Sequence, residues 1–234
     1  MKLSIIIPTL NEESSIEKNL PLIKKELSAE IIVADGGSKD KTVEVAKRFT
    51  ELVSISAAGR GIQMNSGASI STGDWLLFLH TDSIISELGI QRMIEVMRNE
   101  NPPFFKGGQR GVIGGAFRLK IDSDRISLKI ISSIANIRSR FFNIAYGDQG
   151  IFVKRDIFYK IGGYPHIPIM EDVEFVMKLK KRGKFVILPD YITVSSRRWD
   201  KEGVVYCTLR NWILILLYFM GISPHKLKGW YSPP

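Results

Sequence analysis

Three polar segments, each able to bind or transform a charged ligand, follow three apolar runs in the first third of the chain. They are residues 8–12 (PTLNE), 35–40 (DGGSKD) and 80–82 (HTD). The apolar runs before them are typical of buried strands, and ligands of open α/β sheets bind just beyond the carboxyl ends of such strands. The spacing therefore predicts one binding edge built from three loops.

The residue types in these loops suit a nucleotide and a cation. Asp82 follows His80 by two residues, and a carboxylate there could hold a hard cation together with the phosphates it carries. Asp35 could accept a hydrogen bond from a nucleobase N–H or a ribose hydroxyl. A lone Asp-Gly pair more commonly caps a turn, and only the two other loops at the same edge favour binding over that alternative.

The elements that would position these loops alternate between strand and helix. Strands are predicted over 5–7, 30–34, 52–56 and 75–79, with helical spacing in the segments between them. This alternation is typical of a parallel sheet with right-handed crossovers. Pro21 interrupts the helical spacing after the first strand, which predicts two short helices or a kink there.

The second half is predicted to be organised differently, within a single domain over residues 1–234. We expect a nucleotide-binding half (1–105), an acceptor half (106–202) and a C-terminal helix and tail (203–234). The expected elements are a helix to about residue 99, a mobile loop over 101–111, a strand over 114–119, a helix over 126–137, a strand over 149–153, a helix over 171–182 and two short strands ending near residue 195.

Charge and composition limit the partners. The 234 residues carry a net charge of +9 with a pI of about 9.6, which suits an anionic small molecule, nucleic acid or an acidic membrane surface. No nucleic-acid-binding motif is present, so nucleic acid is the weakest of the three. The single cysteine, Cys207, favours a reducing compartment, and no signal sequence is recognised. The protein is therefore expected in the cytoplasm.

The apolar segment 212–220 is shorter than the roughly 20 residues that cross a bilayer. Two alternatives stay open for it. It could pack on the domain as a helix, or it could lie in a membrane interface with Arg210, Lys226, Lys228 and Trp230 as anchors. In the second case the protein would contact the inner face of the membrane.

The three loops together resemble the family-2 glycosyltransferases of GT-A fold. That family carries a first strand ending in Pro-x-x-Asn-Glu, an Asp-Gly-Ser-x-Asp loop and a metal-binding Asp-x-Asp, and the likeness covers nearly the whole chain. The segments 59–65 (GRGIQMN), 146–149 (YGDQ) and 171–172 (ED) resemble a smaller bacterial branch, the radical-SAM/selenodomain-associated transferase 2 type. The resemblance implies an α/β GT-A fold with a mainly parallel central sheet flanked by helices and a C-terminal apolar helix.

The resemblance also implies roles for the residues of the nucleotide half. Asp82 matches the last Asp of Asp-x-Asp and would hold Mg²⁺ or Mn²⁺, whereas His80 replaces the first Asp and would ligate the metal or bind the ribose. Arg60 would lie close to the base or the diphosphate. The residues implied to line the nucleotide-sugar pocket are Pro8, Thr9, Asn11, Glu12 and Asp35.

On the acceptor side, Asp172 is implied to be the general base that deprotonates the acceptor hydroxyl. The alternative is that Glu171 and Asp172 only favour the positive end of a helix. The residues implied to contact the acceptor or the diphosphate are Asp148, Gln149, Glu171, Arg197, Arg198 and Trp199. Solvated arginines beside a buried tryptophan are the alternative for the last three.

The predicted function is metal-assisted, inverting transfer of a hexosyl group from a nucleoside-diphosphate sugar to an acceptor hydroxyl. A UDP-sugar is favoured and a GDP-sugar is an alternative, and the acceptor is either lipid-linked or a small molecule. An inactive nucleotide-binding or membrane-docking module is the main rival. A sugar-nucleotide pyrophosphorylase would need a Gly-rich, Arg-containing loop after the first strand, where this chain has residues 8–12 (PTLNE).

Overall fold

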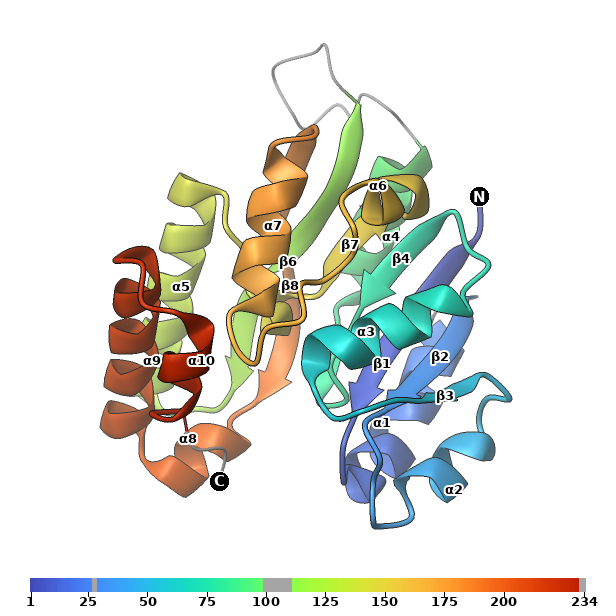
Figure 1. Cartoon of the computed structure of the whole chain (residues 1–234), viewed down its shortest axis with the longest axis horizontal. Coiled ribbons are helices and arrows are strands. Elements are labelled where there is room, and N and C mark those ends of the chain that lie inside the picture. The colour runs from blue at the N-terminus through green and yellow to red at the C-terminus, as the bar shows by residue number, and fades with distance from the viewer. Residues whose placement is uncertain (27–28, 99–110, 232–234) are drawn as a thin grey trace.

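A single mixed β-sheet runs through both halves of the chain in the computed structural model (Figure 1). The structure describes residues 1–26, 29–98 and 111–231. The strands are β1 (Leu3–Thr9), β2 (Glu30–Asp35), β3 (Val53–Ile55), β4 (Trp75–Phe78), β5 (Ser83–Ile85), β6 (Val112–Asp122), β7 (Ile151–Lys154) and β8 (Lys184–Ser195). Across the described residues the sheet order is β3-β2-β1-β4-β7-β6-β8-β5.

The N-terminal strands form the parallel part of the sheet. β1 pairs in parallel with both β2 and β4, and β2 pairs in parallel with β3. Thr9 lies opposite Asp35 in the register of β1 and β2, so the loops that follow these strands open at the same edge. The predicted common edge is therefore confirmed.

Helices cover both faces of this sheet. The helices are α1 (Glu13–Glu26), α2 (Thr42–Lys47), α3 (Arg60–Ser69), α4 (Glu87–Arg98), α5 (Ile126–Phe142), α6 (Arg155–Lys160), α7 (Glu171–Lys180), α8 (Arg197–Glu202), α9 (Val204–Phe219) and α10 (Pro224–Lys228), with a 3₁₀ turn at Gly147–Gln149. Because successive strand residues point to opposite faces, Ile5 and Ile7 pack with α1, α2 and α4, whereas Ile6 packs with α3, α6 and α7. Figure 1 shows α3 and α7 in front of the strands.

The second half changes the strand direction. β7 lies antiparallel between β4 and β6, while β6 and β8 pair in parallel over most of their length. α5 packs on β6, and α9 contacts both α5 and α10. Figure 1 shows these three helices together along one side of the molecule, away from the end of the sheet that holds β2 and β3.

Three details of the expected elements need correction or comment. α1 is one helix that includes Pro21, so the predicted alternative of two short helices is wrong, while the alternative of a kink stays a prediction. Pro21 is exposed, and the carbonyl group it leaves unbonded can be solvated. The two short strands expected before residue 195 are one strand, β8. The loop predicted over 101–111, and with it the boundary at residue 105, lies almost entirely outside the described residues.

Candidate active site

The nucleotide-side edge is held together by the carboxylate of Asp35. Its Oδ1 accepts hydrogen bonds from the backbone N–H groups of Gly37 and Ser38, both at 2.8 Å. Its Oδ2 accepts from Thr9 Oγ1 at 3.2 Å and from the Ser38 hydroxyl. Gly37 has φ +86°, a conformation that favours glycine. Asp35 is only 1% exposed, so its observed role is to shape the loop, and a nucleotide would have to share one of these bonds.

A second set of bonds joins the loop after β1 to the loop after β2. Asn11 has φ 53°, which Asn tolerates better than most residues. Its N–H donates to Ser38 Oγ and its Oδ1 accepts from Lys39 N, both at 2.8 Å. Glu12 N donates to Thr42 Oγ1 at 2.8 Å. The predicted pocket residues on these two loops therefore form one preorganised surface, with half-buried Pro8 beside them.

His80, Asp172 and the 3₁₀ turn meet at Gly147. Gly147 N donates to Asp172 Oδ2 at 2.6 Å. A Cβ atom at position 147 would lie 3.1 Å from His80 Nε2 and 3.3 Å from Asp172 Oδ2, so a larger residue there would displace these side chains by a few tenths of an ångström. Because His80 follows β4 and Asp172 lies in the first turn of α7, this contact places the acceptor-side carboxylate beside the third loop of the nucleotide edge.

The carboxylates of this centre differ in how they are compensated. Both oxygens of Asp172 accept backbone hydrogen bonds, from Gly147 N at 2.6 Å and from Val173 N at 2.8 Å, whereas Asp148 and Glu171 have raised pKa values. Burial raises the pKa of Asp148 to about 6; Arg138 and Arg60 oppose the shift, while Asp172 and Asp82 add to it. Asp148 Oδ1 has no hydrogen-bond partner among the described residues. Burial and the charge of Asp172 raise the pKa of Glu171 to about 7.

His80 and Asp82 respond to the same surroundings. Burial, with the nearby charges of Arg60 and Arg198, lowers the pKa of His80 to about 3, so the imidazole is neutral at physiological pH. Burial also raises the pKa of Asp82, and Glu12 adds to this, although Arg197 lowers it. A neutral imidazole nitrogen and a carboxylate two residues apart are thus available to a ligand.

Cationic side chains surround this centre. Arg197 donates to both carboxylate oxygens of Glu12, at 2.9 Å and 3.2 Å, and so links the nucleotide edge to the start of α8. Arg60 is exposed at the start of α3, within electrostatic range of Glu171, Asp172 and His80. Such an arrangement can bind the negative charge of a diphosphate.

The C-terminal segment also reaches this centre, which the sequence did not predict. Tyr231 lies close enough to Arg60 to help raise the pKa of that guanidinium. Its ring lies 5.2 Å from the guanidinium carbons of both Arg198 and Arg210, and Lys228 lies within electrostatic range of Glu171. No sequence signal marks Tyr231, because its neighbours come from distant elements.

One residue predicted to contact an acceptor serves the framework instead. Gln149 is fully buried. Its Nε2 donates to Phe117 O at 3.0 Å, and its Oε1 accepts from Tyr146 N and Ser139 Oγ, both at 3.1 Å. The acceptor contact expected for Gln149 is therefore corrected to a structural role. Trp199 is half-buried and packs against the small apolar cluster between β6, β8 and α5, and its contact with an acceptor stays a prediction.

Comparison with known proteins identifies the family. The model described as "Glycosyl transferase family 2" matches residues 4–162. The chain belongs to glycosyl transferase family 2. A PGL/p-HBAD biosynthesis glycosyltransferase from Mycobacterium bovis is 30% identical to it over 210 residues, which cover 82% of this chain and 75% of the relative.

Solved structures resemble this family-2 glycosyltransferase in fold. The mannosyltransferase PcManGT from Pyrobaculum calidifontis, in complex with GDP-Man and Mn²⁺, has a TM-score of 0.61 at 18% identity, covering 82% of this chain and 56% of its own. TarS from S. aureus, in complex with UDP-GlcNAc, has a TM-score of 0.60 at 17% identity, covering 83% and 58%. At these identities the likeness shows the GT-A glycosyltransferase fold alone. The chain spans little more than half the length of these two structures.

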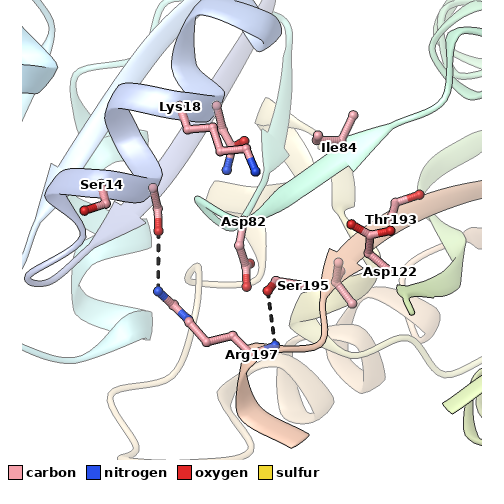
Figure 2. A pocket seen from close by; sticks show the side chains of 11 residues that line it. Ser14, Lys18, Asp82, Ile84, Asp122, Thr193, Ser195 and Arg197 are labelled. Carbon is pink, nitrogen blue, oxygen red and sulfur yellow. Dashed lines mark hydrogen bonds between the residues drawn. The ribbon is translucent and has the colours of Figure 1, made fainter. Parts of the chain in front are cut away.

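A pocket lies beside the carboxylate centre of this glycosyltransferase (Figure 2). Asp82 and Arg197 line it together with residues of α1, β5 and β8, and Lys18 and Asp122 also belong to its wall. The Arg197 guanidinium donates to Ser15 Oγ at 3.5 Å, and Figure 2 shows the Arg197 backbone N–H bonded to Ser195. Asp172 is not among the lining residues, so the pocket adjoins the centre on the side of Asp82.

The residues present fit a divalent cation only with help from a ligand. In the described part of the chain, no group of three His, Cys, Asp or Glu residues could hold a metal ion. Mg²⁺ usually keeps several waters and binds one or two carboxylates plus substrate phosphates. Asp82, with neutral His80 nearby, matches that donor set. The site therefore suits a metal that arrives with a diphosphate better than a resident ion.

Proposed function

We propose that this family-2 glycosyltransferase moves a hexosyl group from a nucleoside-diphosphate sugar to an acceptor hydroxyl with inversion of the anomeric centre. The observation that carries the proposal is the meeting of His80 and Asp172 at Gly147, with both Asp82 and Asp172 close enough to influence the Asp148 carboxylate. A candidate metal ligand and a candidate base thus lie near the same buried carboxylate.

The chemistry is a single in-line displacement. The acceptor oxygen forms a bond to the anomeric carbon while the bond from that carbon to the diphosphate oxygen breaks, and the electron pair leaves with the diphosphate. Asp172 takes the hydroxyl proton, which requires a carboxylate within hydrogen-bond reach. The backbone N–H groups of Gly147 and Val173 each donate to one oxygen of Asp172 and hold the carboxylate in place.

The leaving diphosphate needs compensation of its charge. Asp82, with His80, would hold Mg²⁺ or Mn²⁺, and the bound ion would stabilise the diphosphate as a Lewis acid. Arg60 and Arg198 lie close to His80 and supply fixed positive charge. Pro8, Thr9, Asn11, Glu12 and Asp35 would form the wall that receives the nucleoside.

The donor base, the acceptor and the branch belong to the same proposal. Solved structures of similar fold hold GDP-Man with Mn²⁺ or UDP-GlcNAc, which supports both UDP- and GDP-sugars as candidates; we favour UDP. The acceptor is a lipid-linked or small molecule. The segments around Gly59 and Tyr146 favour the radical-SAM/selenodomain-associated transferase 2 branch, and the single buried cysteine, Cys207, favours a cytoplasmic location.

Turnover of the donor without acceptor tests the proposal. We would incubate the protein with UDP-, GDP- and dTDP-sugars, with and without Mn²⁺, and measure release of free nucleoside diphosphate. The proposal predicts slow, metal-dependent hydrolysis of one donor class that disappears in Asp172→Asn. An inactive binding module, the alternative favoured by His80 in place of a second carboxylate, would bind a nucleotide but release no product from any donor.

A further inference from the structure

A large apolar surface covers the outer faces of α5 and α9, next to α10. Phe141 is 79% exposed on α5, and Leu216 is 61% exposed on α9. We call this surface the α5–α9–α10 face. Its exposed apolar residues are Ile126, Ile130, Ile134, Ile137, Phe141 and Phe142 on α5, Val205, Tyr206, Leu209, Trp212, Ile213, Leu216 and Phe219 on α9, and Met220 and Trp230 beside them.

These residues form continuous stripes rather than scattered exceptions. On α5 they recur at intervals of three or four residues from Ile126 to Phe141, which is the spacing of one helix face. The opposite face holds the buried contact, as with Leu128 on α5 and Leu214 on α9. Each helix is thus apolar on two sides, and only one side is used within the described chain. Soluble monomers rarely expose a contiguous apolar patch of this extent.

The charge on this face has one sign. Residues 126–142 and 203–234 contain six Lys and Arg residues and no Asp or Glu. Arg138 stacks on Tyr146, and Arg210 pairs with Glu202, so these two are committed within the protein. Lys129, Arg140, Lys226 and Lys228 are exposed, although Lys129 also lies 3.5 Å from Asp124 at the start of α5.

We infer that the α5–α9–α10 face docks on an anionic lipid bilayer. Apolar stripes with exposed cations and no acids match the requirement for lying in a membrane interface, where burial of apolar side chains adds to attraction by anionic headgroups. Trp212, Trp230 and Tyr206 have the amphipathic rings that favour that depth. No helix in the described part of the chain is long and apolar enough to cross a membrane.

A second copy of the chain fits this face less well. A two-fold interface would bring the same four cations of each copy toward one another with no carboxylate on α5, α9 or α10 to pair with them, and like charges across an interface oppose association. The proposal goes beyond the glycosyltransferase function, because docking needs no catalytic step. It does place Lys228 and Tyr231, which reach the catalytic centre, next to the lipid.

Vesicle flotation tests the apolar part of the inference. The full chain is mixed with phosphatidylcholine vesicles that contain phosphatidylglycerol, and the bound fraction is measured. Ile213→Asp/Leu216→Asp should weaken binding by at least about tenfold, because two apolar contacts become acidic. Leu88→Asp, on α4 and 65% exposed, is the matched control and should bind as the wild type. Unchanged melting temperatures show that both variants are folded.

A second pair of variants tests how much the exposed cations contribute to vesicle binding. Arg140→Gln/Lys226→Gln should reduce binding to these vesicles several-fold, whereas Lys41→Gln/Lys47→Gln, which removes two exposed lysines elsewhere, should not. High salt or pure phosphatidylcholine vesicles should weaken wild-type binding. The inference is overturned if the wild type fails to float, or if Leu88→Asp weakens binding as much as the α9 variant. It is also overturned if the α9 variant only converts a dimer to a monomer in sedimentation velocity.

Discussion

The buried carboxylates of Asp35 and Asp148 differ in how many hydrogen bonds they accept from the protein. Asp35, at the end of β2, accepts hydrogen bonds at both oxygens from Thr9, Gly37 and Ser38. Asp148, in the 3₁₀ turn, leaves Oδ1 without a partner in the described structure, and burial raises its pKa to about 6. Hydrogen bonds from its own loop therefore compensate the burial of Asp35, whereas Asp148 Oδ1 has no such compensation.

The difference separates a scaffold from a reactive centre. A buried polar group without partners is costly, and such sites persist where a ligand supplies what the protein does not. In the nucleotide edge, the hydrogen bonds of Asp35 and Asn11 are all made within the protein, so this surface is ordered without a ligand. In the centre formed by His80, Asp82, Asp148 and Asp172, the Asp148 Oδ1 atom has no hydrogen-bond partner among the described residues, and a bound ligand could supply one.

Asp172→Asn should show the largest effect. It keeps an oxygen for the Gly147 N–H but removes the base, so turnover should fall by about 10²–10⁴-fold. Nucleotide affinity, measured by titration calorimetry, should stay close to that of the wild type, because Asp172 does not belong to the nucleotide edge. If Asp172→Asn lowers nucleotide affinity as much as turnover, the nucleotide edge and the centre around Asp172 do not have separate roles.

Asp82→Ala should come next. The metal-dependent part of nucleotide affinity should fall by about 10–100-fold, measured by calorimetry with Mn²⁺ and with EDTA. Asp122→Ala is the matched control, since Asp122 is an exposed carboxylate in the wall of the same pocket. Asp82 is misassigned if both variants keep a full response to Mn²⁺.

The pH dependence of stability should distinguish uncompensated from compensated carboxylates. The raised pKa of Asp148 means that the folded protein binds its proton more tightly than the unfolded chain, so this contribution is full at acid pH and is lost as the pH rises through about 6. Asp148→Asn should therefore raise the free energy of unfolding by about 1–2 kcal/mol near neutral pH and by less in acid. Urea unfolding across that range measures it.

Glu30→Gln is the control of opposite sign. Burial alone would raise the pKa of Glu30, but hydrogen bonds from Ser4 and Thr72 outweigh it and lower the pKa. Its contribution is therefore present above the ordinary pKa and is lost in acid, so the substitution should destabilise the protein near neutral pH. If Asp148→Asn and Glu30→Gln change the free energy of unfolding in the same direction near neutral pH, the two carboxylates do not differ in compensation.

The ion pair between Arg197 and Glu12 should contribute least to stability. Arg197 bonds Glu12 through two nitrogens, but its side chain is 60% exposed, and exposed ion pairs contribute less than about 1 kcal/mol. Glu12→Gln should therefore lower stability by no more than Glu44→Gln, which breaks the exposed pair with Arg48. A small loss of nucleotide affinity in Glu12→Gln but not in Glu44→Gln would show that the Arg197–Glu12 pair orients the nucleotide edge.

The Asp35 loop and the parallel pairing of the nucleotide edge could be predicted from sequence because they depend on local patterns, whereas the bonds between the loops after β1 and β2 could not. Asp35 bonds to residues two and three positions away, and the parallel pairing follows from apolar runs separated by helical segments. The exception is Pro21, where tertiary packing of Ile16, Leu20 and Ile23 on the sheet outweighs a local signal for a break.

The reactive centre could be predicted only in part. Motif resemblance suggests Asp82 and Asp172, whose roles stay predictions, but it gives no sign of Gly147, which contacts a loop and a helix from its turn. Gln149 shows the limit of a motif: nothing in the segment 146–149 reveals that its amide is fully used by Phe117, Ser139 and Tyr146. Tyr231 reaches Arg60 from the far end of the chain, and such placements arise only from the complete fold.

A thermal-shift experiment tests the central claim most directly. The melting temperature of the wild type, Asp82→Ala and Asp172→Asn is measured with UDP, GDP and dTDP, each with and without Mn²⁺. A ligand at about 100 times its dissociation constant adds about 2.7 kcal/mol of stability. The account predicts a metal-dependent rise with one nucleotide that persists in Asp172→Asn and disappears in Asp82→Ala. No rise with any nucleotide, or a rise that ignores both Mn²⁺ and Asp82, would contradict it.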